Sequence, residues 1–197
     1  AAPAEEAEAV DAAAPEAEAA AAPVVTAPIQ PVVSTAPVSG FSYGGHVDGL
    51  DAGTANYMRS AGMTWVKKQV RYSLGSDPNG VAGLINIAHE NGFRILLGVV
   101  GYKDQMNNPG YNDQFAAYVG GLAGLGADAI EVWNEPNIDR EWPIGQIDPV
   151  AYTNMLASAY NAIKSVNPNT LVISGAPAPT GFFGGCSGFG CDDAPFI

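Results

Sequence analysis

The sequence contains few basic residues, and this shortage excludes one class of partner. Only 8 Lys and Arg stand against 20 Asp and Glu in 197 residues, which gives a formal charge of −12. A chain with this balance repels a nucleic-acid backbone and has no basic groove to reverse the effect. Nucleic acid is therefore not expected as a partner.

Long apolar runs and phosphate-binding loops are also missing. No uninterrupted apolar stretch approaches the roughly 20 residues of a membrane-spanning helix, so no membrane span is expected. Nucleotide-binding open sheets hold phosphates in G-x-G-x-x-G or G-K-[ST] loops. The first strand-like run and its helix carry neither, since they are joined by GGHVDGLDAG. No cofactor is expected.

Cysteine is nearly absent, and the two that occur lie close together. Cys186 and Cys191 stand in CSGFGC, whose glycines let the loop fold back far enough for a disulfide of ordinary geometry. A zinc site is the weaker alternative, because no His or other Cys lies nearby to complete four ligands. The sequence therefore predicts a disulfide, which an exported protein would keep.

The first 40 residues have neither aromatic nor basic residues. They contain 15 alanines, six prolines and six acidic residues, so they cannot nucleate a core. Residues 1–40 are predicted to be a low-complexity acidic linker, helical at most around residues 4–22, that leaves room for additional modules. The N-terminus lacks the basic start of a signal peptide, but Ala/Pro/Thr-rich linkers are common in exported modular proteins. We expect an extracellular or cell-surface location.

Residues 41–197 show regular alternation between strand-like and helix-like segments. The predicted strands are 41–49, 64–72, 93–101, 129–137 and 170–178. The predicted helices are 51–62, 79–92, 112–127 and 148–168, the last with Asp148 as N-cap before Pro149. Such alternation predicts parallel strands in an α/β protein, either an open doubly wound sheet or a (β/α)₈ barrel.

The segment AIEVWNEPNI, residues 129–138, contains an unusually placed acid. Glu135 follows an apolar run directly, where a carboxylate is costly to desolvate, and Pro136 stops the strand from pairing further. Barrel enzymes carry their chemistry on the C-terminal ends of the strands, which is where Glu135 lies. The position therefore favours the barrel and a functional role for Glu135; the alternative is an acid that caps the next loop.

This strand followed by W-N-E-P-N closely resembles the clan A glycoside hydrolases, the retaining (β/α)₈ enzymes that include family 5 cellulases and mannanases and family 39 xylosidases. The stretch EVWNEPNIDREW is most similar to family 39. The resemblance implies that Glu135 is the general acid/base and that Asn134 binds the sugar 2-hydroxyl. It also matches Arg71, in QVRY, to an arginine near the nucleophile. This chemistry requires no metal.

The resemblance covers only part of such an enzyme. A complete barrel takes about 250 residues, whereas 157 follow residue 40, enough for five strand–helix units. Retention needs a second carboxyl group about 5 to 5.5 Å from the first. In the clan it is a Glu after the seventh strand, and none of the glutamates here fits that position. We expect the chain to be the N-terminal part of a longer enzyme, inactive alone, with the nucleophile beyond its end.

Other residues are weaker candidates for substrate binding. Trp142 would stack on a sugar ring or pack on the barrel rim. His46, at the end of the first strand, would line the sugar site or be held by a hydrogen bond, and Tyr102 ends the third strand near the substrate.

An interior ion pair is also predicted. Because alternate barrel strands fill the same interior layers, Lys67 should lie level with Glu131, and Arg71 level with Glu135. We therefore expect a buried Lys67–Glu131 pair; the alternative is that Lys67 faces a helix and reaches solvent.

The function that these features predict is a retaining glycoside hydrolase that cleaves O-glycosidic bonds of a β-linked polysaccharide or oligosaccharide. The alternative is a non-catalytic carbohydrate-binding or cell-surface protein on a degenerate barrel.

Overall fold

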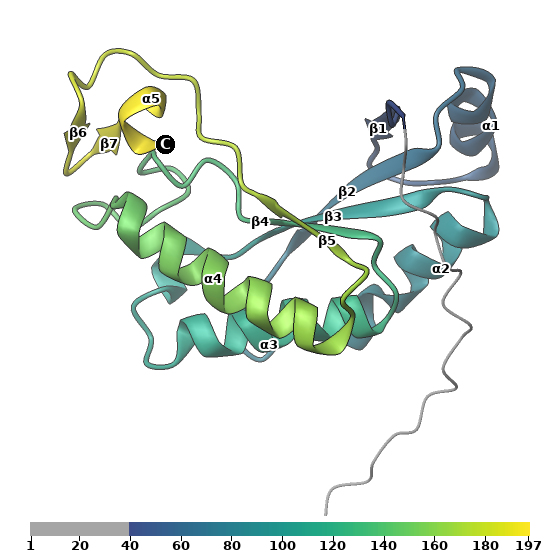
Figure 1. The fold of residues 1–197 in the computed structure, drawn as a ribbon, viewed down its shortest axis with the longest axis horizontal. Coiled ribbons are helices and arrows are strands. Elements are labelled where there is room, and N and C mark those ends of the chain that lie inside the picture. Colours follow the sequence, from purple (N-terminus) through teal and green to yellow (C-terminus); the bar gives the residue numbers. More distant parts are fainter. Residues whose placement is uncertain (1–39) are drawn as a thin grey trace, which may run out of the picture. The chain divides into compact units, whose positions relative to one another are not determined.

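The computed structural model describes residues 40–197, in which strands and helices alternate as predicted (Figure 1). The predicted linker lies outside the described residues except for Gly40. The first half contains β1 (Gly44–His46), α1 (Ala52–Ser60), β2 (Trp65–Arg71), the 3-10 turn η1 (Pro78–Val81), α2 (Ala82–Glu90), β3 (Arg94–Val100) and the 3-10 turn η2 (Lys103–Gln105). It is followed by α3 (Tyr111–Gly124), β4 (Ala129–Val132), α4 (Pro149–Val166), β5 (Leu171–Ser174), β6 (Cys186–Ser187), β7 (Gly190–Cys191) and α5 (Asp193–Phe196).

The main sheet has five parallel strands in the order β1-β2-β3-β4-β5. A doubly wound sheet would reverse its strand order and carry helices on both faces. Here the order never reverses, and α2, α3 and α4 lie along one face of the sheet (Figure 1). The arrangement is consistent with part of an α/β barrel, as the sequence predicts.

Side-chain caps set the start of two helices. The carboxylate of Asp51 accepts a hydrogen bond of 2.8 Å from the amide of Thr54, at the start of α1. The carboxylate of Asp148 accepts one of 2.9 Å from Val150, and Pro149 occupies the first turn of α4. The predicted cap of this last helix is therefore confirmed, and both caps satisfy amides that a helix start leaves without partners.

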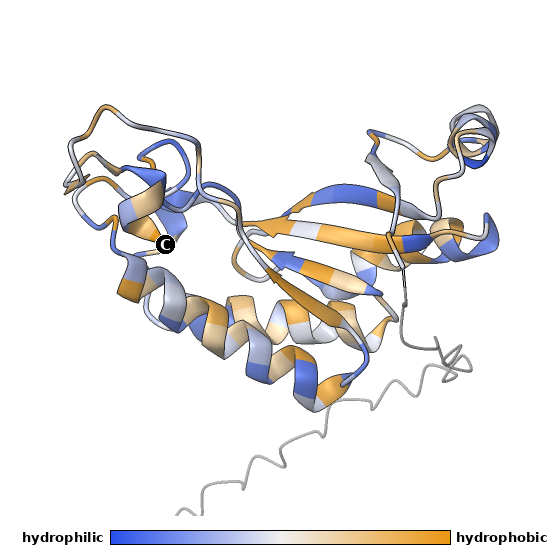
Figure 2. Ribbon diagram, turned by 45° about the horizontal axis from the view of Figure 1, so that its top comes forward, coloured by the Kyte–Doolittle hydropathy of each residue, from blue (hydrophilic) through white to orange (hydrophobic). Residues whose placement is uncertain are grey.

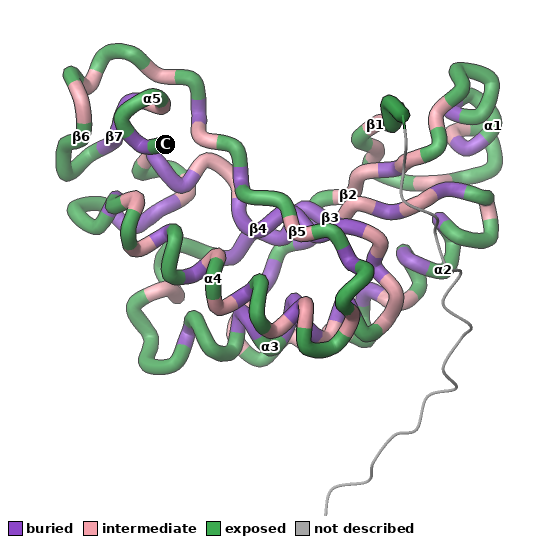
Figure 3. The backbone as a smooth tube through the Cα atoms, viewed as in Figure 1, coloured by how far each residue is buried: buried purple, intermediate pink, exposed green. Residues whose placement is uncertain are grey.

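The core lies between the central strands and the helices that cover them. On β3, Ile95, Leu97 and Val99 are at most 2% exposed, as are Ile130 and Val132 on β4. Figure 2 shows the apolar positions along these strands and helices, and Figure 3 shows that burial is concentrated there. By contrast, most of β1 and β5 is exposed or half-buried.

The segment after β5 forms a small disulfide-bonded unit. Cys186 and Cys191 form the disulfide that the sequence predicts, across the two-stranded β6–β7 ladder. Asp192 accepts hydrogen bonds from the amides of Gly185 (3.0 Å) and Phe183 (3.1 Å). These backbone hydrogen bonds, that of Gly185 foremost, lower the pKa of Asp192.

Candidate active site

The turn after β4 has an unusual backbone. Trp133 (φ 73°) and Glu135 (φ 46°) are the two non-glycine residues with positive φ in the described part of the chain. This conformation costs an L-residue about 1 to 3 kcal/mol and is concentrated at functional sites. The two residues flank Asn134, and the amide of Glu135 donates a 2.9 Å hydrogen bond to the carbonyl of Ala176 after β5. The strain therefore lies on the predicted catalytic residue.

Aromatic packing holds this turn in place. Trp133 is fully buried, with ring centroids 5.7 Å from Phe115 and 5.5 Å from Trp142. Its indole N–H donates to the carbonyl of Glu141 at 3.2 Å. Ring packing of this kind adds to the free energy of burial.

Trp142 belongs to the same packed group. It is 3% exposed, contacts Trp133 and Tyr152, and donates its indole N–H to the carbonyl of Gln146 at 2.9 Å. Trp142 therefore packs against neighbouring side chains, which is one of the two roles predicted for it. Because 3% of its surface is exposed, Trp142 leaves little ring area for a sugar, and its role in substrate binding stays a prediction.

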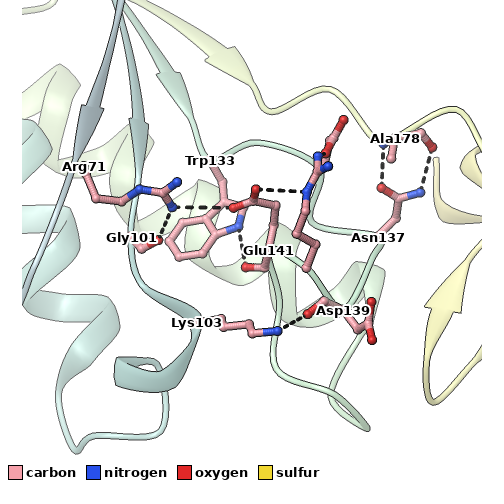
Figure 4. A network of polar contacts seen from close by, with 10 residues as sticks. Arg71, Gly101, Lys103, Trp133, Asn137, Asp139, Glu141 and Ala178 are labelled. Atoms are coloured by element: carbon pink, nitrogen blue, oxygen red, sulfur yellow. Dashed lines mark hydrogen bonds and ion pairs between the residues drawn. The ribbon is translucent and has the colours of Figure 1, made fainter.

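A chain of ion pairs joins the end of β2 to the turn (Figure 4). Arg71 donates to the carbonyl of Gly101 at 2.9 Å and pairs with Glu141 at 3.5 Å. Glu141 also pairs with Arg140 at 3.4 Å, and Arg140 pairs with Glu135. Glu141, whose side chain is 14% exposed, therefore holds two arginines, one of which contacts the candidate acid.

The position of Arg71 differs from the prediction. Its register partner on β3 is Val100, whereas Glu135 lies in the turn beyond the end of β4, so the two residues are not level. Arg71 instead lies over the ring of Tyr102, with 5.4 Å between its guanidinium carbon and the ring centroid. It reaches Glu135 only through Glu141 and Arg140.

The predicted Lys67–Glu131 ion pair is present, with a different register. Gly98 of β3 lies between Gln69 and Glu131, so Gln69, not Lys67, is level with Glu131. Lys67 crosses β3 diagonally, and a Cβ on Gly98 would lie 3.0 Å from the Glu131 carboxylate and 3.3 Å from Lys67 Cε. The pair is only partly buried, since the Lys67 side chain is 32% exposed and that of Glu131 12%.

The remaining candidates are only partly brought together. Asn134 is half-buried beside Glu135, and Tyr102 is 46% exposed. His46 lies exposed on β1, with Lys67 as its register neighbour, and is not part of the ion-pair chain. Across residues 40–197, no three His, Cys, Asp or Glu side chains gather as a metal site would require.

Sequence reasoning missed several residues that organise the site. Asn137 is fully buried and its amide group binds both backbone groups of Ala178 (2.7 and 3.0 Å) and the carbonyl of Cys191 (2.9 Å). It ties the turn to the segment after β5. In the sequence, Asn137 could have been noticed as an amide directly after Glu135-Pro136. Arg140 and Glu141 could have been noticed as adjacent opposite charges just after the turn.

A hollow of about 490 Å³ lies beside the site, at the starts of α3 and α4. The residues that line it include three with uncharged amide side chains, one aromatic residue, a glycine and one acid: Asn112, Gln146, Asn154, Trp142, Gly145 and Asp148. Such a surface can hydrogen-bond a neutral, hydroxyl-rich ligand.

No helix among the described residues is long and apolar enough to cross a membrane.

The chain is similar to a solved structure in its fold and not to any recognised family in its sequence. No family model matches the chain, and no curated protein does. Among solved structures, the catalytic domain of a mannanase from Streptomyces sp. SirexAA-E matches with 20% sequence identity and a TM-score of 0.43. The match covers 62% of this chain and 40% of that domain, so the chain spans less than half of the structure that it resembles.

Proposed function

We propose that this chain is part of a retaining glycoside hydrolase that cleaves O-glycosidic bonds of a β-linked polysaccharide or oligosaccharide, with Glu135 as general acid/base. The observation that carries the proposal is the positive-φ turn over Trp133 and Glu135, directly after β4 of a sequentially ordered parallel sheet. This is the end of the sheet where barrel enzymes carry catalytic groups.

The roles follow from the chemistry of retention. Protonated Glu135 donates to the leaving glycosidic oxygen and then removes a proton from the water that releases the sugar. Asn134, next to it, hydrogen-bonds a sugar hydroxyl without adding charge. Arg140 must leave Glu135 before the carboxyl group can act, and its side chain is 67% exposed to solvent.

No glutamate of this chain is proposed as the nucleophile. Glu131 is paired with Lys67, and Glu141 is paired with both Arg71 and Arg140. The proposal therefore concerns the activity of the full-length protein encoded by the gene.

The test is Glu135→Gln in that full-length protein. The amide keeps the shape but carries no transferable proton, so hydrolysis of natural β-glycans should fall roughly 10²- to 10⁴-fold. Activated aryl glycosides should lose less in the first step, and azide should restore turnover because it attacks without a base. Asp139→Asn, an exposed acid in the same loop, is the matched control. Natural-glycan rates equal to wild type would reject the assignment of Glu135, whereas a wild-type protein that binds but does not hydrolyse any glycan would favour the non-catalytic alternative.

We also propose an extracellular or cell-surface location. The Cys186–Cys191 disulfide supports it, because disulfides persist in oxidising compartments. Immunoblots of culture medium, cell surface and lysate should place the protein outside the cell; its confinement to the lysate would contradict the proposal.

A further inference from the structure

The loop between β5 and α5 exposes two aromatic rings to solvent, one of which also contacts a neighbouring ring of the loop (Phe182–Phe183 centroids 4.1 Å apart). Residues 175–191 contain no charged residue and three phenylalanines. Phe183 is half-buried against Gly190, where an added Cβ would lie 2.0 Å from the ring. Phe182 and Phe189, however, are 78% and 65% exposed. Burying a Phe side chain stabilises a fold, and this loop leaves most of the surface of two of them in solvent.

The loop that carries these rings is fixed on several sides. The Cys186–Cys191 disulfide closes it, and Asp192 accepts amide hydrogen bonds from Phe183 and Gly185. Its tip is joined to the loop before α4, where the amide of Gly145 donates to the carbonyl of Gly188 at 2.6 Å. A ring held on a rigid support loses little conformational entropy when it binds a ligand.

The loop also adjoins both the candidate site and the hollow. The amide of Cys191 donates to the carbonyl of Asn137 at 2.8 Å, two residues after Glu135. Gly145, which contacts the loop tip, lines the hollow together with the amide side chain of Gln146. In Figure 1 the loop, with β6 and β7, lies at the opposite end of the sheet from α1.

The exposed rings of the loop and the amide residues of the hollow together fit a neutral sugar chain. The C–H faces of a pyranose pack on an aromatic ring, while its hydroxyl groups hydrogen-bond to amides and backbone groups. The charged residue that lines the hollow is Asp148, and the one that accepts hydrogen bonds from the loop is Asp192, so both are acidic. They disfavour an anionic membrane surface or an acidic polymer.

We propose that Phe182 and Phe189 form a stacking site for a neutral β-linked glycan chain, which continues from the loop tip towards the hollow. The inference rests on the proposed function, because it extends the site around Glu135 to a longer substrate. The rings act in binding and take no part in bond cleavage.

The experiment measures binding of the full-length protein to neutral polysaccharides by affinity electrophoresis in gels that contain glucomannan, xylan or mixed-linkage β-glucan. The wild-type protein should be retarded by at least one of them. Phe182→Ala and Phe189→Ala should each weaken binding roughly three- to tenfold. Phe182→Trp and Phe189→Trp should bind as tightly as wild type, because Trp also offers an aromatic face. Phe41→Ala, at a position 93% exposed just before β1, is the matched control and should change nothing. Circular dichroism and an intact-disulfide mass verify the fold of each variant.

The outcomes separate this inference from the proposed function. Glu135→Gln should bind like wild type, since stacking needs no proton transfer. Absence of retardation in all three gels, unchanged binding of the Phe182→Ala/Phe189→Ala double variant, or an equal loss in Phe41→Ala would overturn the stacking site. If glycan binding needs the two rings while full-length Glu135→Gln keeps wild-type hydrolysis, the stacking site stands and the acid/base assignment fails.

Discussion

At the scale of single residues, Gly98 shows how one missing side chain makes room for an ion pair. Lys67 reaches Glu131 across β3 at Gly98, where an added Cβ would crowd both side chains. Exposed ion pairs contribute about 0 to 1 kcal/mol, whereas breaking a buried pair costs about 3 to 5 kcal/mol. This pair is intermediate in exposure, so removing one partner should cost more than at an exposed pair and less than at a buried one.

Gly98→Ala is expected to lower the free energy of unfolding by about 1 to 2 kcal/mol, because the new methyl group crowds the flexible ends of Lys67 and Glu131. In a Lys67→Ala background the loss should be smaller, since one of the crowded groups is gone. Urea titrations give both values. Gly83→Ala, at an open position on α2, is the control and should stabilise by up to about 1 kcal/mol. Equal losses in the two backgrounds would contradict this account.

At the scale of elements, the sequence predicted all five strands and all four long helices, but with strands that were too long. The fourth predicted strand, 129–137, ends at Val132, because the positive-φ turn starts at Trp133. Apolar runs and helix caps are local signals and can be located from sequence. The small β6–β7 ladder has no such pattern, although its disulfide was predicted.

The same distinction explains the candidate site. Glu135 and Asn134 were found from a contiguous motif, whereas Arg140 and Glu141 gain their roles from contacts with the end of β2. The register error for Lys67 has a similar cause, because strand position alone does not show that Gly98 permits a diagonal contact.

One side chain of α4 clamps the ends of two strands. Tyr152 donates its hydroxyl to the carbonyl of Val132, at the end of β4, and accepts from the amide of Gly175, after β5. Tyr152→Phe should therefore cost about 1 to 2 kcal/mol, since the amide of Gly175 keeps its second acceptor, the Val132 carbonyl. Hydrogen exchange of the Gly175 amide should accelerate. Tyr160→Phe, half-exposed on the same helix, should change neither quantity; equal exchange rates in all three proteins would refute the clamp.

At the scale of the whole described molecule, buried aromatic side chains are concentrated on the helix-covered side of the sheet. Tyr72, Tyr111 and Tyr118 pack together with Phe115, with ring centroids 4.9 to 6.4 Å apart. The hydroxyl of Tyr111 has no hydrogen-bond partner within residues 40–197, and burial raises the pKa of all three phenols. At one edge of the sheet, β5 leaves Leu171 and Ile173 49% and 38% exposed. Figure 3 shows that this strand is less buried than the central strands.

Buried tyrosines, Tyr152 among them, should make the stability of the molecule depend on alkaline pH. Burial raises the pKa of Tyr152 from its usual 10.0 to about 12. Above pH 10 the unfolded chain loses this proton while the folded chain keeps it, so the free energy of unfolding should fall as pH rises. The slope for Tyr152 is about 1.4 kcal/mol per pH unit between pH 10 and 12. Tyr111, whose pKa burial also raises, should add to it.

Urea titrations at pH 8, 10 and 11 measure the slope, and phenylalanine variants assign it. Tyr152→Phe and Tyr111→Phe should each flatten the decline above pH 10, because the replaced ring has no proton to lose. Tyr111→Phe should also be more stable than wild type at pH 8, since it removes a buried hydroxyl that finds no partner among the described residues. Tyr57→Phe, at a position 81% exposed, should leave the slope unchanged. A wild-type stability that stays constant from pH 10 to 11 would show that the folded chain does not hold these phenols neutral.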